Sequence, residues 1–397
     1  MEDYQYTPLS SPTSIRVLQL HIAKTENTST TSFSLKEVDL QESPKYEALS
    51  YTWGQATSYD KSTETYQWAP TEKCPIQISN TGVVRITRNL CDLFKNLIEG
   101  APLGQSVSSI WADQVCINQN DVQERNSQVA MMKDIYAQAW RTLIWLGKPD
   151  SDMLVVANLF EVITTIDYSS LQRTRGSSDE ELQEDILKVI AIKSDSNWQD
   201  DLEFIGSIVN TLNKSWFSRA WIVQEVILSQ EPLLLFGKKT YSIAVLNNLV
   251  TLTFFLERRG TNSFTELSEK AQLPGARGLL TLKSIMHCRQ MMEHDVSKQG
   301  ILKDVLNTLA FSLDASDPRD RIYAFLAFQE SNENQIVPDY TLEINDAYTK
   351  ISESIVKSTN SLSILGLVRG TSSPGSLPSW VVDWRVKEET QGNPFDD

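Results

Sequence analysis

The sequence predicts an α/β fold built on a mainly parallel sheet that is flanked by helices. Short apolar runs at Tyr46–Tyr51, Ile110–Ala112, Thr142–Leu146 and Leu233–Phe236 have the length of buried strands. Helical patterns lie between successive runs. Strands that alternate with helices favour parallel pairing, because the helices cover the faces of the sheet. We therefore expect these four segments to lie in one sheet.

Two hairpins are expected near the start of the chain. Segments Ser14–Ala23 and Phe33–Leu40 have strand character on either side of a Thr/Ser-rich turn, and Ile76–Ile86 is typical of a second hairpin. Apolar residues with helical spacing follow between Thr87 and Ile98. The first hairpin predicts a β extension of the core over residues 1–45.

Several helices have recognisable starting signals. Asp121-Val-Gln-Glu124 is a capping-box pattern, and Asp317-Pro318 supplies a cap and a first-turn proline for a helix through Phe328. Trp216–Leu228 predicts one continuous helix, and Tyr340–Lys357 predicts another.

The chain divides into three predicted regions. Residues 1–45 form the hairpin extension, residues 46–238 form the α/β domain with a polar insertion near 150–215, and residues 239–397 form a mainly helical region. The loop Glu257–Arg277, which contains glycine and proline, separates the core from that last region.

Composition narrows the function classes. A formal net charge of −15, without a long run of Lys or Arg, argues against a nucleic-acid partner. No stretch has the roughly 20 apolar residues of a membrane span, and the polar start lacks a signal-peptide core, so a cytoplasmic protein is expected. Four cysteines and three histidines without metal-ligand spacing predict no metal site.

Three sequence blocks resemble the fungal heterokaryon-incompatibility (HET) family. They are Tyr46–Gly54 (YEALSYTWG), Ile110–Gly147 (IWADQVCINQNDVQER…MMKDIYAQAWRTLIWLG) and Trp216–Leu228 (WFSRAWIVQEVIL), and their order and spacing also fit the family. Two later segments, Ser316–Phe328 and Leu377–Trp384, resemble the continuation found in long HET proteins.

The resemblance implies a role in fungal non-self recognition, in which incompatible partners trigger growth arrest or programmed cell death. HET domains are regarded as remote relatives of Toll/interleukin-receptor (TIR) domains, so a TIR-like, flavodoxin-like sheet is expected. Some TIR domains cleave NAD with a glutamate on a helix. Trp221-Ile-Val-Gln-Glu225 is similar to the Trp-x-x-x-Glu that carries this residue. NAD would then be a substrate, and no cofactor is required.

By this resemblance Glu225 is the first catalytic candidate. On a helix, Trp221 and Glu225 share one face, so an aromatic wall stands beside the carboxylate and raises its pKa. The Trp221 ring can also flank a flat ligand, so Trp221 is a ligand-binding candidate as well. Such a glutamate can stabilise the oxocarbenium-like state of nicotinamide loss, as in glycoside hydrolysis. The alternative is that Glu225 forms a structural ion pair with Arg219 or Arg125 while Trp221 packs in the core.

Asp113 is the second catalytic candidate, because it ends a predicted strand where open α/β sheets bind ligands. It would otherwise cap the following loop. Arg125 is a candidate to hold a phosphate, or else to pair with Asp113 or Glu225. A ligand-binding role is also expected for four residues at the first strand end, where the glycine allows close approach of the backbone: Ser50, Tyr51, Trp53 and Gly54.

Two functions remain open from the sequence. One is an enzyme that cleaves a nicotinamide nucleotide, and the other is a non-enzymatic signalling module that acts by homotypic assembly. The first requires Glu225, Asp113 and Arg125 to converge on one site. An incompatible-allele protein is the expected partner in either case, and a homo-oligomer is possible in the second.

Overall fold

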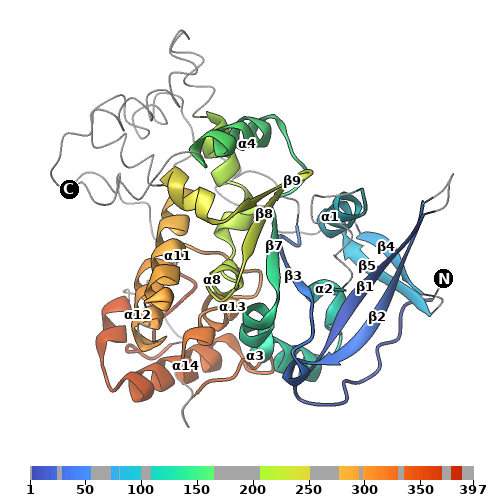
Figure 1. Ribbon diagram of the computed structural model, residues 1–397. Coiled ribbons are helices and arrows are strands. Elements are labelled where there is room, and N and C mark those ends of the chain that lie inside the picture. The colour runs from blue at the N-terminus through green and yellow to red at the C-terminus, as the bar shows by residue number, and fades with distance from the viewer. Residues whose placement is uncertain are drawn as a thin grey trace, which may run out of the picture.

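The computed structural model describes residues 2–24, 29–54, 73–79, 81–99, 109–164, 206–250, 277–294, 298–329, 335–368 and 377–386. Within them, nine strands form one mixed sheet in the order β5-β4-β2-β1-β6-β3-β7-β8-β9 (Figure 1). Most of the predicted insertion, and the loop predicted at Glu257–Arg277, lie outside the described residues.

The centre of the sheet consists of four parallel strands. These are β6 (Ser109–Trp111), β3 (Glu47–Tyr51), β7 (Arg141–Trp145) and β8 (Pro232–Phe236), so the four predicted core strands do lie in one sheet. Every residue of β3 is buried, as expected for a parallel strand that is covered on both faces. Numbered along the chain, the four strands have the order 2-1-3-4, which matches the start of a flavodoxin-like sheet.

Antiparallel pairs extend this centre on both sides. The N-terminal hairpin, β1 (Ser14–Lys24) with β2 (Ser29–Asp39), joins the sheet because Leu18 of β1 pairs with Ile110 of β6. The second predicted hairpin is present as β4 (Lys73–Ile78) and β5 (Gly82–Thr87), and β9 (Lys239–Ser242) pairs with β8. The parallel core therefore lies within a larger mixed sheet.

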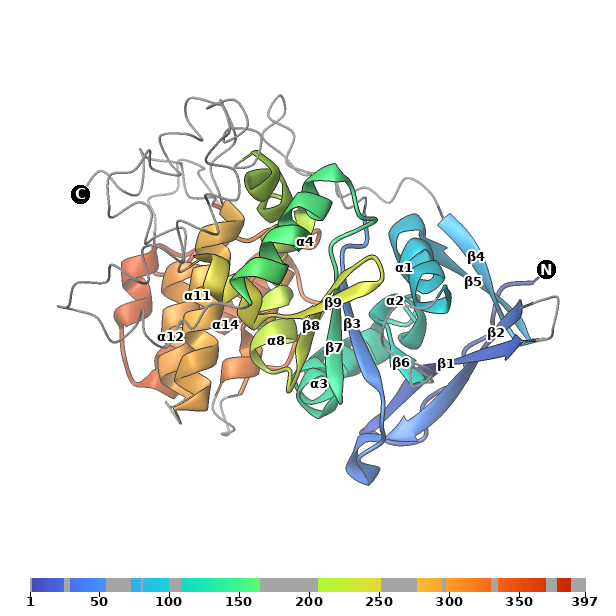
Figure 2. The ribbon, with the colours of Figure 1, turned by 45° about the horizontal axis from the view of Figure 1, so that its top comes forward.

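Two hydrophobic cores cover the two faces of the sheet. Figure 2 labels β6 between β3 and β1, as in the strand order. In β7, Leu143 and Trp145 belong to one core while Ile144 belongs to the other, because successive strand residues point to opposite faces. The first core includes residues of α1 (Arg88–Ile98), α2 (Asp113–Cys116) and α3 (Val122–Gln138). The second includes residues of α4 (Ser151–Ile163) and α8 (Ile222–Ile227).

The C-terminal region packs into the second core and is mainly helical, as predicted. It contains α11 (Arg277–Glu293), α12 (Lys298–Thr308), α13 (Asp320–Tyr323), η4 (Leu326–Phe328), α14 (Ile344–Thr359) and η5 (Ser363–Leu367). A short 3₁₀ turn, η1 (Leu40–Glu42), follows the first hairpin. In the part of the chain that the structure describes, no helix combines the length and apolarity needed to cross a membrane.

Two predicted helices are interrupted. Trp216–Leu228 is not continuous, because the 3₁₀ helix η3 (Ser215–Ser218) ends before α8 begins. Between them, Arg219 is extended, with φ −73° and ψ 134°, and forms a β-bridge with Asp314. The helix predicted from Asp317 to Phe328 likewise consists of the shorter α13 and η4.

Candidate functional site

The carboxyl ends of β3 and β6 carry the first group of site residues. The hydroxyl of Ser50 is buried and donates a hydrogen bond to Oε2 of Glu225, which lies on α8. The indole Nε1 of Trp216 donates to the same hydroxyl over 2.8 Å. These contacts lie beside β7, at the point where the strand order reverses and where open α/β sheets bind ligands.

Glu225 forms a bidentate ion pair with Arg219. Nη2 of the arginine lies 2.9 Å from Oε1, and Nη1 lies 3.1 Å from Oε2. The glutamate is 1% exposed and the arginine 8% exposed. In this conformation both carboxylate oxygens of Glu225 are occupied, as the structural alternative for this residue expects.

Asp113 is the partner of two residues from the first strand end. Its carboxylate accepts hydrogen bonds from the hydroxyl of Tyr51 and from Nε1 of Trp53, each over 2.8 Å. It also accepts the backbone N–H of Gln114, so it holds the loop that follows β6. Gly54 is buried next to Trp53. The structure thus brings Asp113 together with two of the four residues predicted at the end of β3, Tyr51 and Trp53.

Electrostatic interactions connect the two carboxylates. Burial raises the pKa of Glu225, the Arg219 guanidinium opposes this rise, and the charge of Asp113 adds to it. Burial also raises the pKa of Asp113, while the hydrogen bond from Tyr51 and the charge of Arg219 lower it. Arg219 therefore acts on both acids, and each acid binds a proton more readily than an exposed carboxylate does.

This arrangement can perform proton transfer or stabilise a cation if Glu225 leaves Arg219. Two partly or fully buried carboxylates with raised pKa values at a ligand-binding edge have the properties of an acid/base pair. While the ion pair holds, Glu225 has no free oxygen for a ligand. Among the described residues, no group of three or more His, Cys, Asp or Glu side chains is placed to hold a metal ion.

Comparison with known proteins places residues 46–225 in a family. Residues 46–225 match the family model described as "Heterokaryon incompatibility protein (HET)", and the match ends at Glu225. Residues 46–225 belong to the HET family. This HET domain contains β3, β6 and β7 with the carboxylates at their ends.

One curated relative is "Heterokaryon incompatibility protein 6, OR allele" of Neurospora crassa. It is 25% identical to this chain over 425 aligned positions, which cover 96% of the chain and 59% of the relative. The chain thus spans about three fifths of the length of that relative. No solved structure matches the chain significantly.

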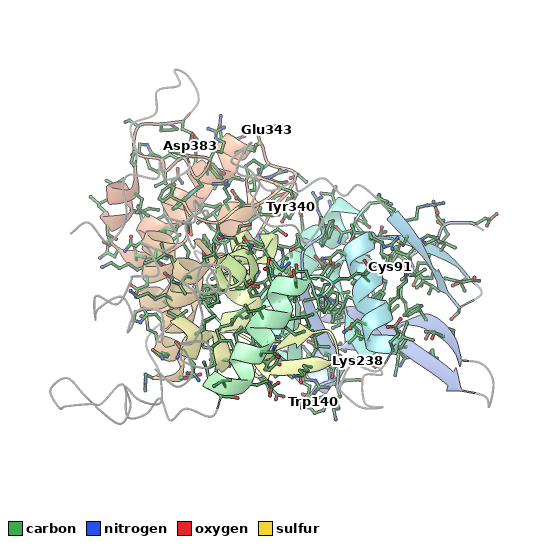
Figure 3. The ribbon with its side chains drawn as sticks, turned by 90° about the horizontal axis from the view of Figure 1, so that it is seen from above. Cys91, Trp140, Lys238, Tyr340, Glu343 and Asp383 are labelled. Carbon is green, nitrogen blue, oxygen red and sulfur yellow. The ribbon has the colours of Figure 1, made fainter. Side chains whose placement is uncertain are left out.

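Two of the predicted site residues face another cluster, at the border between the HET domain and the C-terminal region. The guanidinium of Arg125 lies 4.2 Å from the ring centroid of Tyr340, instead of against Glu225 or Asp113. Trp221 lies close enough to Asp320 to lower its pKa, and the hydroxyl of Tyr340 donates a hydrogen bond to the same carboxylate. Tyr340 lies where the C-terminal helices meet the rest of the molecule (Figure 3).

The side chain of Asp320 is partly buried in this cluster. Burial raises its pKa to about 6; the hydrogen bond from Tyr340 opposes the rise, and the charge of Asp317 adds to it. Trp221 packs against both hydrophobic cores, since it lies between the two layers. The Trp221 and Glu225 side chains therefore have different partners, although Glu225 N–H donates to the Trp221 carbonyl as in a helix.

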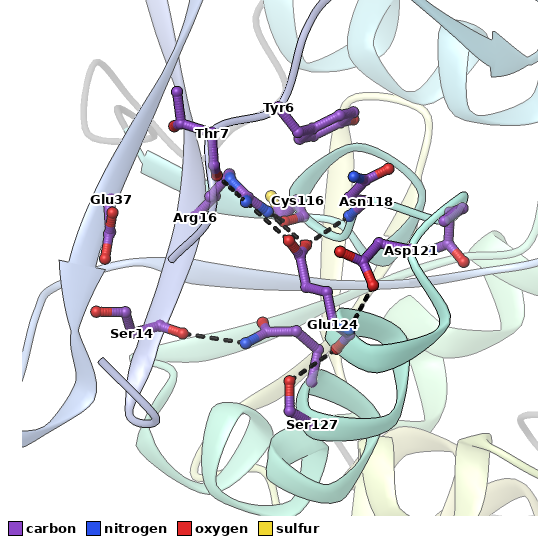
Figure 4. A network of polar contacts seen from close by, with 12 residues as sticks. Tyr6, Thr7, Ser14, Arg16, Glu37, Cys116, Asn118, Asp121, Glu124 and Ser127 are labelled. Atoms are coloured by element: carbon purple, nitrogen blue, oxygen red, sulfur yellow. Dashed lines mark hydrogen bonds and ion pairs between the residues drawn. The ribbon is translucent and has the colours of Figure 1, made fainter. Parts of the chain in front are cut away.

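A second buried Arg–Glu pair supports the loop after β6 (Figure 4). Arg16 of β1 forms a bidentate ion pair with Glu124 of α3, at 2.6 and 2.9 Å. The backbone N–H of Asn118 donates to the same glutamate over 2.7 Å. Sequence reasoning missed Arg16, and it expected Glu124 to complete a capping box; only the Asp121 half of that box forms.

The sequence did suggest Arg219 as a structural partner of Glu225. It did not predict the contacts of Asp320 and Tyr340 at the second cluster. Asp320 and Tyr340 carry no local signal for a contact with Trp221, because they lie far along the chain and only folding brings them together.

Proposed function

We propose that this chain acts in heterokaryon incompatibility, as an effector that arrests growth or kills the cell after an incompatible partner is met. The proposal is supported by the HET domain at residues 46–225 and by the name of the Neurospora crassa relative. The incompatible partner would be another protein, in keeping with the strongly acidic chain and its lack of a basic stripe.

We further propose that the HET domain cleaves a nicotinamide nucleotide. The observation that carries this proposal is that Ser50, Tyr51, Asp113 and Glu225 converge at the carboxyl edge of the parallel strands. Arg125, the third residue that the enzyme hypothesis requires at this site, lies over Tyr340 instead, so it takes no part in the proposed reaction. A TIR-like relationship of the domain, with Glu225 in the catalytic position, belongs to the same proposal.

The proposed reaction is a hydrolysis. The bond between the ribose anomeric carbon and the nicotinamide nitrogen breaks, and its electron pair leaves with nicotinamide. Water adds to the anomeric carbon and gives up one proton, which leaves ADP-ribose when NAD is the substrate. A freed Glu225 carboxylate would stabilise the oxocarbenium-like state, and Asp113 could accept the proton of the water. NAD is a substrate here, and no cofactor is required.

The locked state of Glu225 favours a second candidate function. Glu225 is 1% exposed, and both of its carboxylate oxygens are engaged with Arg219 and Ser50. A HET domain that keeps this pair closed would signal without catalysis, by homotypic assembly of the chain. The two candidates differ in whether Glu225 must ever leave Arg219.

The test is to incubate the purified full-length protein with NAD and to measure nicotinamide. Glu225→Gln keeps the shape of the side chain and removes its charge. Loss of one preorganised electrostatic group lowers a rate by about a hundred- to a thousandfold. Glu124→Gln is the matched control, because it makes the same change in another buried, bidentate Arg–Glu pair.

Cell killing provides the second measurement. We expect Glu225→Gln to fold and to lose killing in the fungal host, while folded Glu124→Gln retains it. If Glu225→Gln kills as well as the unaltered protein, the catalytic proposal is wrong and the assembly function leads. If neither the unaltered protein nor any variant arrests growth beside an incompatible strain, the incompatibility proposal itself fails.

A further inference from the structure

The C-terminal region holds the chain on both sides of Arg219. The N–H of Ala220 donates to the carbonyl of Asp314 over 2.9 Å, and the N–H of Asp314 donates to the carbonyl of Ser218. The side chain of Asp314 is fixed in turn by Arg321, at 2.9 Å. This bridge keeps Arg219 extended, at the point where the predicted helix is interrupted.

The next residue, Trp221, is held by side chains of the same region. Asp320 lies beside Trp221 and accepts a hydrogen bond from the hydroxyl of Tyr340. The Tyr340 ring stacks under the Arg125 guanidinium, and its backbone N–H donates to Asn126 over 3.0 Å. Tyr340 is therefore attached to α3 of the HET domain as well as to Asp320.

The C-terminal region also holds the far end of α8. Nη1 of Arg289 on α11 donates to the carbonyls of Val226 and Ser229, each over 2.7 Å. An arginine on the last carbonyls of a helix satisfies acceptors that the helix leaves unpaired. The helix that carries Glu225 is thus held at both ends by residues outside the family match.

The Arg219–Glu225 pair depends on the interruption of the helix. In one continuous helix, residues six positions apart are separated by about 9 Å along the axis and by about 120° around it. Arg219 and Glu225 would then point in different directions and could not pair. The sequence of Trp216–Leu228 favours such a continuous helix, whereas the bridge to Asp314 prevents it.

We propose that the HET domain is locked in an inactive state by a clamp of four residues, Arg289, Asp314, Asp320 and Tyr340. When the clamp opens, residues 216–228 become one helix, and Glu225 separates from Arg219. The regulatory part of this inference rests on the proposed function, because it treats a freed Glu225 as the active form. The conformational part, that the clamp keeps residues 216–228 from forming one helix, does not depend on the proposed function. Binding of the incompatible partner to the C-terminal region would open the clamp.

The test uses Tyr340→Phe, which removes the hydroxyl that donates to Asp320 and keeps the ring over Arg125. Tyr241→Phe is the matched control, because Tyr241 donates to Glu161 over 2.8 Å, another tyrosine–carboxylate hydrogen bond that lies outside the clamp. Hydrogen–deuterium exchange of the full-length proteins is measured at Asp314 and across residues 218–228. Asp320→Ala is the second clamp variant, in case Tyr340→Phe does not fold.

We expect Tyr340→Phe to raise exchange at the Asp314 amide by about tenfold or more, because a hydrogen bond to a charged group contributes at least that factor to local opening. Exchange in β3 and β7 should stay unchanged. In Tyr241→Phe, exchange at Asp314 and across residues 218–228 should stay unchanged. The clamp variant should also kill at a lower expression level than the unaltered protein.

Each result decides one part of the inference. Unchanged exchange at Asp314 and residues 218–228 in a folded clamp variant overturns the clamp. Raised exchange without stronger killing, when the unaltered protein does kill, overturns its inhibitory role. If neither protein kills or cleaves NAD, the proposed function fails, and exchange alone still decides whether the clamp holds the interrupted helix.

Discussion

Two buried ion pairs of the same chemistry, Arg16–Glu124 and Arg219–Glu225, have different surroundings. Arg16 also donates to the carbonyls of Thr7 and Cys116, and Glu124 accepts a backbone N–H. The pair at Glu225 has the rotatable hydroxyl of Ser50 as its further partner. The first pair is tied directly to backbone groups, so we expect it to stay closed. The second depends on the interruption of the helix at Arg219, and we propose that it opens when residues 216–228 rearrange.

The largest expected effect is the loss of Arg16. Arg16→Ala leaves a buried glutamate unpaired and two carbonyls without their donor, so it should lower the free energy of unfolding by about 3 to 5 kcal/mol. Arg219→Ala should cost less, about 2 to 3 kcal/mol, because burial already raises the pKa of Glu225 and the acid can take up a proton. Urea denaturation of both variants measures the difference, and an equal or reversed ranking would break the comparison.

Truncation of Trp221 should follow in size. The ring is only partly buried but packs against both cores, so Trp221→Ala should cost about 3 kcal/mol, the low end for a large aromatic side chain. Thermal denaturation provides the measurement. An unchanged melting temperature would show that the segment beside Arg219 is not held by the two cores.

The free energy of unfolding should depend on pH through Asp320, the carboxylate beside Trp221. The folded state raises the pKa of Asp320 from 3.8 to about 6, so the folded protein binds an extra proton between these values. Stability from this group is therefore complete below about pH 4 and is lost as the pH rises through 6. The rise corresponds to at most about 3 kcal/mol, and about 2 kcal/mol is expected for a partly exposed side chain.

Asp320→Asn isolates this contribution. Between pH 4 and 7, the unaltered protein should lose about 2 kcal/mol relative to the variant, as measured by urea denaturation at each pH. Other buried acids titrate in both proteins, so they cancel in the difference. A constant difference across the range would place the Asp320 pKa near its ordinary value.

The smallest effect concerns Ser50. Ser50→Ala removes the donor to Glu225 and the acceptor of the Trp216 indole, so it should cost about 1 to 2 kcal/mol. It should also increase exchange at residues 218–228, because Arg219 is then the one side-chain hydrogen-bond partner of Glu225 among the described residues. A variant with unchanged stability and exchange would mean that the hydroxyl contributes nothing to the closed pair.

The sequence predicted the parallel core because each strand carries its own signal. An apolar run of strand length between helical patterns reports burial directly, as at Thr142–Leu146, and the hairpins and α1 follow from equally local patterns. Asp113 and the end of β3 were found together for the same reason. Strand ends in a parallel sheet meet at one edge whatever the details of packing.

The tertiary structure alone decided the partners of Arg125, Trp221 and Glu225. Periodicity over Trp216–Leu228 favours one helix, yet a backbone bridge to Asp314 interrupts it and turns Arg219 toward Glu225. Arg125 lies over Tyr340, a residue far along the chain. Hydrophobic spacing indicates which face of a segment is buried. It does not indicate which distant charged residue contacts that segment. Long-range polar contacts depend on the packed arrangement of whole elements, so only the fold determines them.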